Sequence, residues 1–176
     1  ESSEIDTLTY IAAEKAYGRG ELDEAKKAFD DYLKSHPNGA FRLNSYYYQG
    51  VICYNQGNKE EAVANFAKVL EFPENQYREE AMTAAAGIYY DNKEYDKAAP
   101  LYKEIAAQSG NEERCTTALT RVLHIAIEQD SKSDIIEYAT KIEKQQNVSP
   151  EQVREAVFCR AKANLELNER DKAFED

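Results

Sequence analysis

Apolar and small side chains recur along this chain at the spacing of helical faces. Tyr47, Gly50, Val51 and Tyr54 occupy positions i, i+3, i+4 and i+7 of one such face, and residues 62–70 carry another. No stretch of the sequence alternates between apolar and polar residues in the manner of a half-buried strand. The pattern therefore predicts an all-α protein built from amphipathic helices.

The chain also repeats itself. Each copy has a small residue on a first helix, a turn, an alanine on a second helix and an aromatic residue one helical turn later. In one of the clearest copies these are Gly50, Gly57, Ala62 and Phe66. The turn recurs at intervals of 36 to 38 residues, and its five positions are Gly20, Gly57, Lys93, Asp130 and Asn168. A near-constant period of this length is typical of a solenoid of helix hairpins.

Each residue type in the repeat has a structural role. A small residue lets the first helix approach the second closely, and the aromatic side chain fills the space that remains. Glycine suits the positive φ that commonly ends a helix, so Gly20 and Gly57 favour tight turns, whereas Lys93 is less suited to that conformation. Ser149 before Pro150 predicts a capped helix start.

This pattern resembles the tetratricopeptide-repeat (TPR) family, and the resemblance extends over residues 4–176. It implies antiparallel helix hairpins wound into a right-handed superhelix. It predicts one domain over residues 1–176, with repeats at about 4–37, 41–73, 77–108 and 112–145 and a partial copy at 149–176. Two features depart from the family pattern: the protein has no Trp, and its period exceeds the usual value of about 34 residues.

The last copy of the repeat is incomplete in the sequence. We expect its first helix over 149–167, a turn at Asn168, and a second helix that has completed one turn at Asp176. Such an element cannot bury its apolar face alone, so Val153, Val157 and Leu165 should be partly uncovered. The sequence therefore predicts that the chain is a fragment of a longer protein with further repeats.

The composition narrows the classes of partner. Hydrophobic residues make up 42% and charged residues 31% of the chain, which is typical of a globular protein. The uncharged run at residues 81–90 is too short to cross a bilayer, which takes about twenty residues. Because 33 acidic and 22 basic residues give a net charge of −11, we expect no nucleic acid as a partner. The charge favours solubility, and recognition of a basic partner is the alternative.

Residues for catalysis or metal binding do not cluster in the sequence. His36 and His124 lie in different repeats, and Cys53, Cys115 and Cys159 form neither a disulfide framework nor a metal-binding pair, so the cysteines are expected to be small buried residues. The phosphate-loop, dinucleotide and serine-hydrolase motifs are absent from the sequence. We therefore predict a protein that is not an enzyme and needs neither a cofactor nor a metal.

The TPR resemblance implies that the first helix of each repeat lines a concave groove in which ligands are held. Transferring that register to this chain gives the candidate partner-binding residues Tyr10, Glu14, Asn44, Tyr47, Val51, Thr83, Thr120 and His124. Tyrosine is frequent among them, and it suits binding surfaces because it joins an apolar ring to a polar tip.

The tyrosines of this groove fall into two sets. Tyr17, Tyr54 and Tyr90 are favoured as core residues, because aromatic residues at helical spacing usually pack and aliphatic residues replace them in later copies. Tyr10 and Tyr47, together with Asn44, are favoured for ligand contact. The Lys, Asn and Arg residues with which some family members grip a terminal carboxylate are not found at the matching positions, which are Tyr10, Glu14, Tyr48, Glu80 and Ala84.

These observations predict a non-catalytic scaffold that binds a protein or peptide. Two alternatives are a self-association module that forms a homodimer and a recruitment domain for an enzyme outside this stretch of chain. The segments HPNG and FPENQYREEA are similar to repeats of bacterial cell-envelope TPR proteins of the outer-membrane assembly and Tol-Pal accessory types. That similarity implies a periplasmic or cell-envelope location, with a cytoplasmic adaptor as the alternative.

Overall fold

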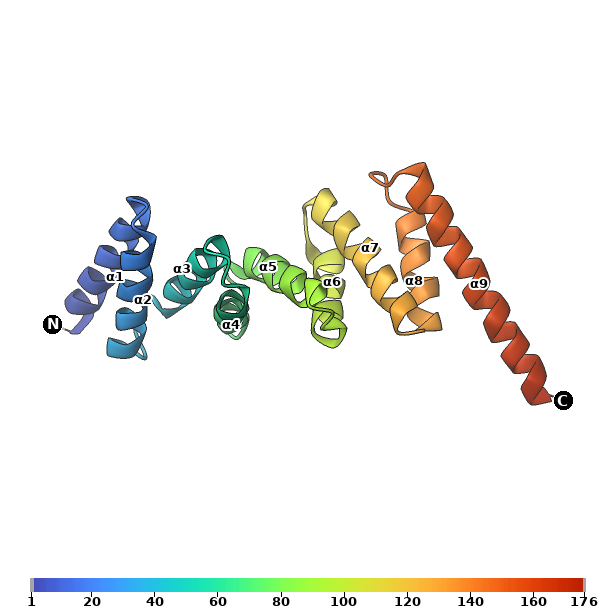
Figure 1. Ribbon diagram of the computed structural model, residues 1–176, viewed down its shortest axis with the longest axis horizontal. Helices are drawn as coiled ribbons and strands as arrows, with labels where there is room; N and C mark the ends of the chain where they lie inside the picture. Colours follow the sequence, from blue (N-terminus) through green and yellow to red (C-terminus); the bar gives the residue numbers. More distant parts are fainter. Residues whose placement is uncertain (1, 176) are drawn as a thin grey trace. The chain divides into compact units, whose positions relative to one another are not determined.

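The computed structural model describes residues 2–175, and within them the chain forms α-helices joined by short loops, with no strand (Figure 1). The helices are α1 (Ser2–Gly18), α2 (Leu22–Ser35), α3 (Arg42–Asn55), α4 (Lys59–Leu70), α5 (Arg78–Asp91), α6 (Tyr95–Gln108), α7 (Glu112–Glu128), α8 (Lys132–Glu143) and α9 (Pro150–Glu175). The predicted all-α class is confirmed.

The chain divides into two compact units, Glu1–Ile88 and Tyr89–Asp176. In the first unit α1 packs against α2, α2 against α3, and α3 against α4. In the second unit α7 packs against both α6 and α8, and α8 packs against α9. Helix α5 contributes residues to both units. The single solenoid over residues 1–176 stays a prediction.

The turns between paired helices confirm the turn positions read from the repeat. Gly20 and Gly57 have φ values of 77° and 80°, and the non-glycine residues Lys93 and Asp130 have φ values of 59° and 53°. A Cβ added at Gly20 or Gly57 would meet no atom within 4 Å, so glycine is favoured there by its backbone conformation alone. Lys93 holds the same conformation in spite of its side chain.

Replacing Lys93 with glycine should therefore stabilise the protein. A left-handed backbone costs an L-residue about 1–2 kcal/mol, so Lys93→Gly should raise the free energy of unfolding by about 1 kcal/mol after the extra flexibility of the unfolded chain is allowed for. The urea midpoint of the purified variant measures this gain. Asn92→Gly is the control, since Asn92 lacks a positive φ and should gain nothing from glycine. Equal midpoints for wild type and Lys93→Gly would contradict the argument.

The core of the first unit is formed by side chains at the contacts between α1, α2 and α3. Its buried members are Tyr10, Ala13, Ala16, Ala25, Phe29, Tyr32 and Ile52. In the neighbouring α3–α4 hairpin, a Cβ added at Gly50 would lie only 2.6 Å from the ring of Phe66, which is itself 3% exposed. This contact confirms why the repeat has a small residue on the first helix and an aromatic residue on the second.

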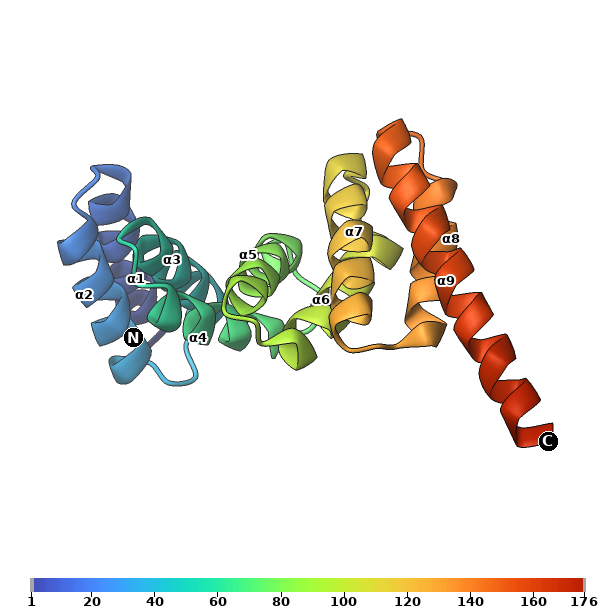
Figure 2. The ribbon, with the colours of Figure 1, turned by 45° about the vertical axis from the view of Figure 1, so that its right-hand side comes forward.

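The structure corrects the prediction for the fifth copy of the repeat. Helix α9 runs without interruption from Pro150 to Glu175, so the expected turn at Asn168 does not form. Residues 165–175 contain neither Gly nor Pro and are rich in strong helix formers, which outweigh the weaker helix propensity of one asparagine. Both ribbon views show α9 running along α8 and continuing past its end (Figures 1 and 2).

The start of α9 agrees with the sequence prediction. The Ser149 hydroxyl accepts a hydrogen bond from the Gln152 backbone N–H at 3.1 Å, and the Ser149 N–H donates to the Gln152 side-chain oxygen at 3.0 Å. This reciprocal pair is a capping box, and it satisfies two backbone donors that a helix start otherwise leaves open.

Candidate partner-binding surfaces

Tyr10 was predicted to contact a ligand, and the structure shows instead that it belongs to the core. Its side chain is only 4% exposed, and its ring stacks on Phe41 with centroids 4.3 Å apart. Its hydroxyl donates to the Glu14 carboxylate at 2.7 Å, and burial followed by this bond raises the pKa of Tyr10. The prediction failed because α1 turns Tyr10 towards Phe41, which follows α2 in sequence. Glu14 itself is exposed.

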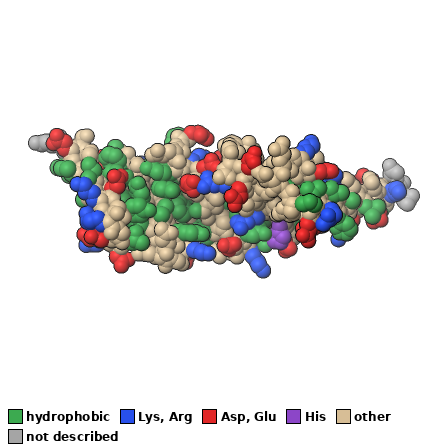
Figure 3. Space-filling view, turned by 90° about the horizontal axis from the view of Figure 1, so that it is seen from above, with side chains coloured by type: hydrophobic (Ala, Val, Ile, Leu, Met, Phe, Trp, Pro, Cys, Tyr) green, Lys and Arg blue, Asp and Glu red, His purple; other side chains and the backbone are tan. Residues whose placement is uncertain are grey.

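Four half-buried tyrosines form a connected group in the first unit, which we call the tyrosine cluster: Tyr17, Tyr47, Tyr48 and Tyr77. Tyr47 stacks on Tyr77 with centroids 4.4 Å apart, and Tyr17 packs against Tyr48 at 4.8 Å. Burial, followed by the neighbouring Tyr77 hydroxyl and Glu14 carboxylate, raises the pKa of Tyr48. The cluster presents amphipathic tyrosine rings, and Figure 3 shows a hydrophobic area on one face of the N-terminal part of the chain.

Of the other residues predicted in the first unit, Asn44 contacts this cluster. The Asn44 side-chain amide donates to the Tyr77 hydroxyl at 3.0 Å, and Val51 is half-buried. The Thr83 hydroxyl donates to the Glu79 carbonyl of its own helix at 2.7 Å. Tyr54 is 45% exposed, so its expected place in the core is wrong. A partner on this face would therefore meet tyrosine rings and one asparagine.

In the second unit, His124 belongs to a polar and aromatic group on α7. Its Nδ1 lies 2.8 Å from the Tyr90 hydroxyl, and its Nε2 lies 3.7 Å from the Glu128 carboxylate. The Arg121 guanidinium lies over the Tyr90 ring, 4.6 Å from its centroid. The Thr120 hydroxyl donates to the Thr116 carbonyl at 2.8 Å. His124 is therefore exposed and polar, and its role in partner binding stays a prediction.

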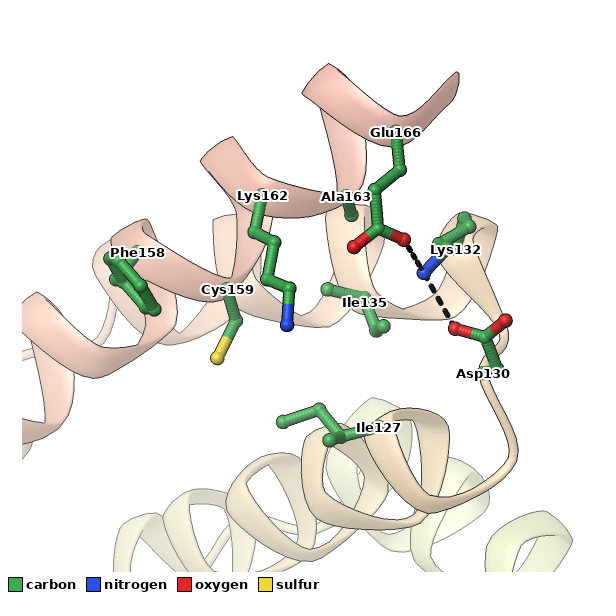
Figure 4. A pocket seen from close by; sticks show the side chains of 9 residues that line it. All are labelled: Ile127, Asp130, Lys132, Ile135, Phe158, Cys159, Lys162, Ala163 and Glu166. Carbon is green, nitrogen blue, oxygen red and sulfur yellow. Dashed lines mark hydrogen bonds and ion pairs between the residues drawn. The ribbon is translucent and has the colours of Figure 1, made fainter. Parts of the chain in front are cut away.

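A pocket of about 230 Å³ lies beside this group, lined by residues of α7, α8 and α9 and the turn between α7 and α8 (Figure 4). Its apolar lining includes two exposed side chains, Ile127 at 43% and Phe158 at 69%. Lys132 bridges the carboxylates of Asp130, at 2.5 Å, and Glu166. The full lining is Ile127, Asp130, Lys132, Ile135, Phe158, Cys159, Lys162, Ala163 and Glu166.

Lys162 gives this pocket its available positive charge. Its side chain reaches into the pocket next to Cys159 and towards Ile127 (Figure 4). Within residues 2–175 it forms no ion pair, whereas Lys132 is already paired with two carboxylates. The pocket therefore combines an apolar lining with one cation that can meet a carboxylate.

The sequence did not identify several residues of these surfaces. Ile127 takes the place of a tyrosine in the repeat, and its side chain is exposed. Tyr77 lies just before α5, outside the register used to find groove residues. Lys162 follows Phe158 by four positions on the same helix, and that spacing is a signal that could have found it.

The three cysteines differ in how far they are buried. Cys53 is buried as expected, but Cys115 and Cys159 are only half-buried, and all three are free thiols. In the described part of the chain, no group of three or more His, Cys, Asp or Glu side chains could hold a metal ion. None of the helices described is long and apolar enough to cross a membrane.

Comparison with known proteins supports a protein built from repeated helix hairpins. Residues 12–77, from within α1 to the residue before α5, match the tetratricopeptide repeat family model. Helix α9, which contains Val153, Val157 and Leu165, lies outside this match. Its resemblance to the family depends on the sequence pattern alone. No curated protein matches the sequence at a significant level.

Two solved structures share the fold over most of the chain. The kinesin light chain TPR-like repeats of Podosopora anserina have 15% identity and a TM-score of 0.51, with 99% of this chain and 92% of that one covered. MamA, residues 41 to the end, from Desulfovibrio magneticus RS-1 has 16% identity and a TM-score of 0.50, with 94% and 96% covered. At these identities the similarity concerns the fold alone.

Proposed function

We propose that this protein is a non-catalytic scaffold that binds a protein or peptide through the exposed faces of its first helices. The observation that carries the proposal is the pocket of the second unit, where Ile127 and Phe158 leave apolar surface uncovered beside Lys162. Uncovered apolar surface rimmed by polar groups is typical of protein interaction sites. The TPR match of residues 12–77 supports the same class of function.

The chemistry of the pocket favours a particular kind of peptide. A pocket of about 230 Å³ accommodates one aliphatic or aromatic side chain against Ile127 and Ile135. Lys162 can then pair with a carboxylate close to that side chain, since the carboxylates of Asp130 and Glu166 are already held by Lys132. We therefore propose a peptide with an apolar residue and an adjacent Asp or Glu.

Peptide selection on the purified chain tests this proposal. Peptides enriched from a display library should share the apolar and acidic pair, and Ile127→Asp should weaken their binding at least about tenfold, because it places a charge in the apolar lining. Calorimetry measures the affinities, and circular dichroism checks that the variant remains folded. Enriched peptides that bind Ile127→Asp as tightly as wild type would place their site elsewhere, and no enrichment at all would overturn the proposal.

The tyrosine cluster is the corresponding candidate surface of the first unit. Tyr47→Ala removes a half-buried ring that stacks on Tyr77, so we expect the loss of partners bound there with a stability cost of about 1–3 kcal/mol. Thermal unfolding and calorimetry separate these two effects. A collapse in stability would assign Tyr47 to the core, and unchanged binding would remove it from the interface.

For the cellular setting we propose the periplasm or cell envelope, on the strength of the HPNG and FPENQYREEA segments. Cell fractionation of the tagged protein tests this location, and a cytosolic fraction would favour the adaptor role instead.

A further inference from the structure

The outer face of α9 carries a stripe of six exposed side chains. At about 100° per residue, Glu151, Arg154, Phe158, Leu165, Glu169 and Lys172 fall within an arc of about 60°. The buried residues Ala156 and Ala163 lie on the opposite side of the helix, which packs against α8. We call these six residues the outer stripe. At its centre Phe158 is 69% and Leu165 59% exposed.

The outer stripe is symmetric in both spacing and charge. Its intervals are three, four, seven, four and three residues, so they read the same in either direction. Each residue has a complementary counterpart at the mirrored place: acidic Glu151 mirrors basic Lys172, and basic Arg154 mirrors acidic Glu169. Phe158 mirrors Leu165, and at the centre Ala161 mirrors Lys162, each about 20° outside the arc. A second copy of the same helix in antiparallel orientation is therefore complementary to this one along the whole stripe.

The orientation follows from the charges. In an antiparallel pair, Arg154 faces Glu169 of the second copy, Glu151 faces its Lys172, and Phe158 faces its Leu165. A twofold axis repeats each contact, so four ion pairs flank a centre of two Phe158 and two Leu165 side chains. In a parallel pair each charge would face its own kind, which opposes association. Flanking charges of this sort select partner and orientation in helix pairs, while the apolar centre supplies most of the affinity.

We propose that two copies of this chain associate through the outer stripes of α9 as an antiparallel helix pair. The contact length from Glu151 to Lys172 is about 32 Å, so the contact is that of a modest interface with a dissociation constant on the order of micromolar. This function goes beyond peptide binding. Ile127 and the Lys132 ion pairs lie on the α7 and α8 side of α9, outside this interface. Phe158 belongs to both surfaces, and Lys162 lies beside the stripe.

Charge exchange between copies tests the pairing. Arg154→Glu and Glu169→Arg should each raise the dissociation constant of the homodimer about tenfold or more, because each puts like charges opposite each other. Mixing the two variants restores opposite charges at both places, so they should form a heterodimer. Analytical ultracentrifugation from about 1 to about 200 µM covers the expected range. Lys15→Glu on α1, an exposed residue of the other unit, is the control and should dimerise like wild type.

Three results would overturn the proposal: a wild-type chain that stays monomeric at the highest concentration, single variants that dimerise like wild type, or a mixture that stays monomeric. Circular dichroism of each variant verifies the fold. Both charges are exposed, so neither substitution should unfold the protein. Ile127→Asp should keep the homodimer, so failure of the peptide proposal and failure of this one are distinguishable.

Discussion

Replacing Gly50 with valine is expected to destabilise the first unit by about 3 kcal/mol, because the added atoms have no space in the α3–α4 hairpin. The first added carbon alone would lie 2.6 Å from the Phe66 ring. That ring is buried, with 3% exposure, so its neighbours hold it in place. Either the ring must leave its position or the two helices must separate. Urea unfolding followed by circular dichroism measures the loss.

A matched control and a rescue separate this cause from a general effect of valine in a helix. Gly18 is near the end of α1 and has no atom within 4 Å of an added Cβ, so Gly18→Val should change stability by less than about 1 kcal/mol. Combining Gly50→Val with Phe66→Leu removes the ring atoms that collide, so the two losses should be less than additive. Additive losses would show that the Gly50 and Phe66 contact is not the source of the cost.

The repeat pattern predicted much of the local structure because it reflects contacts between residues close in sequence. The glycine turns, the close approach of α3 and α4, and the capped start of α9 each depend on a few residues within one hairpin. The same reasoning predicted a turn at Asn168 that does not form. Spacing alone placed this turn, and asparagine permits a left-handed backbone without requiring it.

The candidate surfaces were harder to predict because exposure depends on packing between hairpins. Tyr10 and Tyr47 occupy equivalent places in successive copies, yet Tyr10 is covered by Phe41 while Tyr47 stays half-buried against Tyr77. Phe41 and Tyr77 both lie in or beside the connections between hairpins, where the repeat is least regular. A register transferred from a family cannot show which of its positions such connections cover.

The glycine of the HPNG segment illustrates a reason that only the structure reveals. Gly39 has no positive φ, but a Cβ there would collide with the hydroxyl of Tyr32 at the end of α2. That hydroxyl donates to the Asp6 carboxylate of α1 and accepts from the Phe41 N–H at 2.9 Å. Asp6 in turn accepts from the Ala40 N–H at 3.1 Å. The buried Tyr32 thus ties α1 and α2 to the connection that leads into α3.

Removing that hydroxyl by Tyr32→Phe should lower the free energy of unfolding by about 1–3 kcal/mol, because the Phe41 N–H and one Asp6 oxygen lose their partner while the ring still fills its space. Burial, followed by the bond to Asp6, raises the pKa of Tyr32 to about 12, so the hydroxyl remains a donor at neutral pH. Urea midpoints of wild type and variant at pH 7 measure the loss. Tyr46→Phe, at a half-buried tyrosine on α3, is the control.

The same variant should change how stability depends on acid. The Tyr32 hydroxyl and then the Ala40 N–H hold the pKa of Asp6 below its ordinary value, so this carboxylate prefers to be charged in the folded state. Its contribution is therefore present above the unfolded pKa of about 3.9 and is lost as pH falls through the lower folded value. In Tyr32→Phe only the bond from the Ala40 N–H to Asp6 remains, so the pKa of Asp6 should rise. Because protonation of Asp6 weakens its bond to Tyr32 in wild type, the stabilities of wild type and variant should converge as pH falls below about 4. Carboxyl titration by NMR reads the Asp6 pKa directly, and an unchanged value would show that the Tyr32 hydroxyl does not stabilise the charged form.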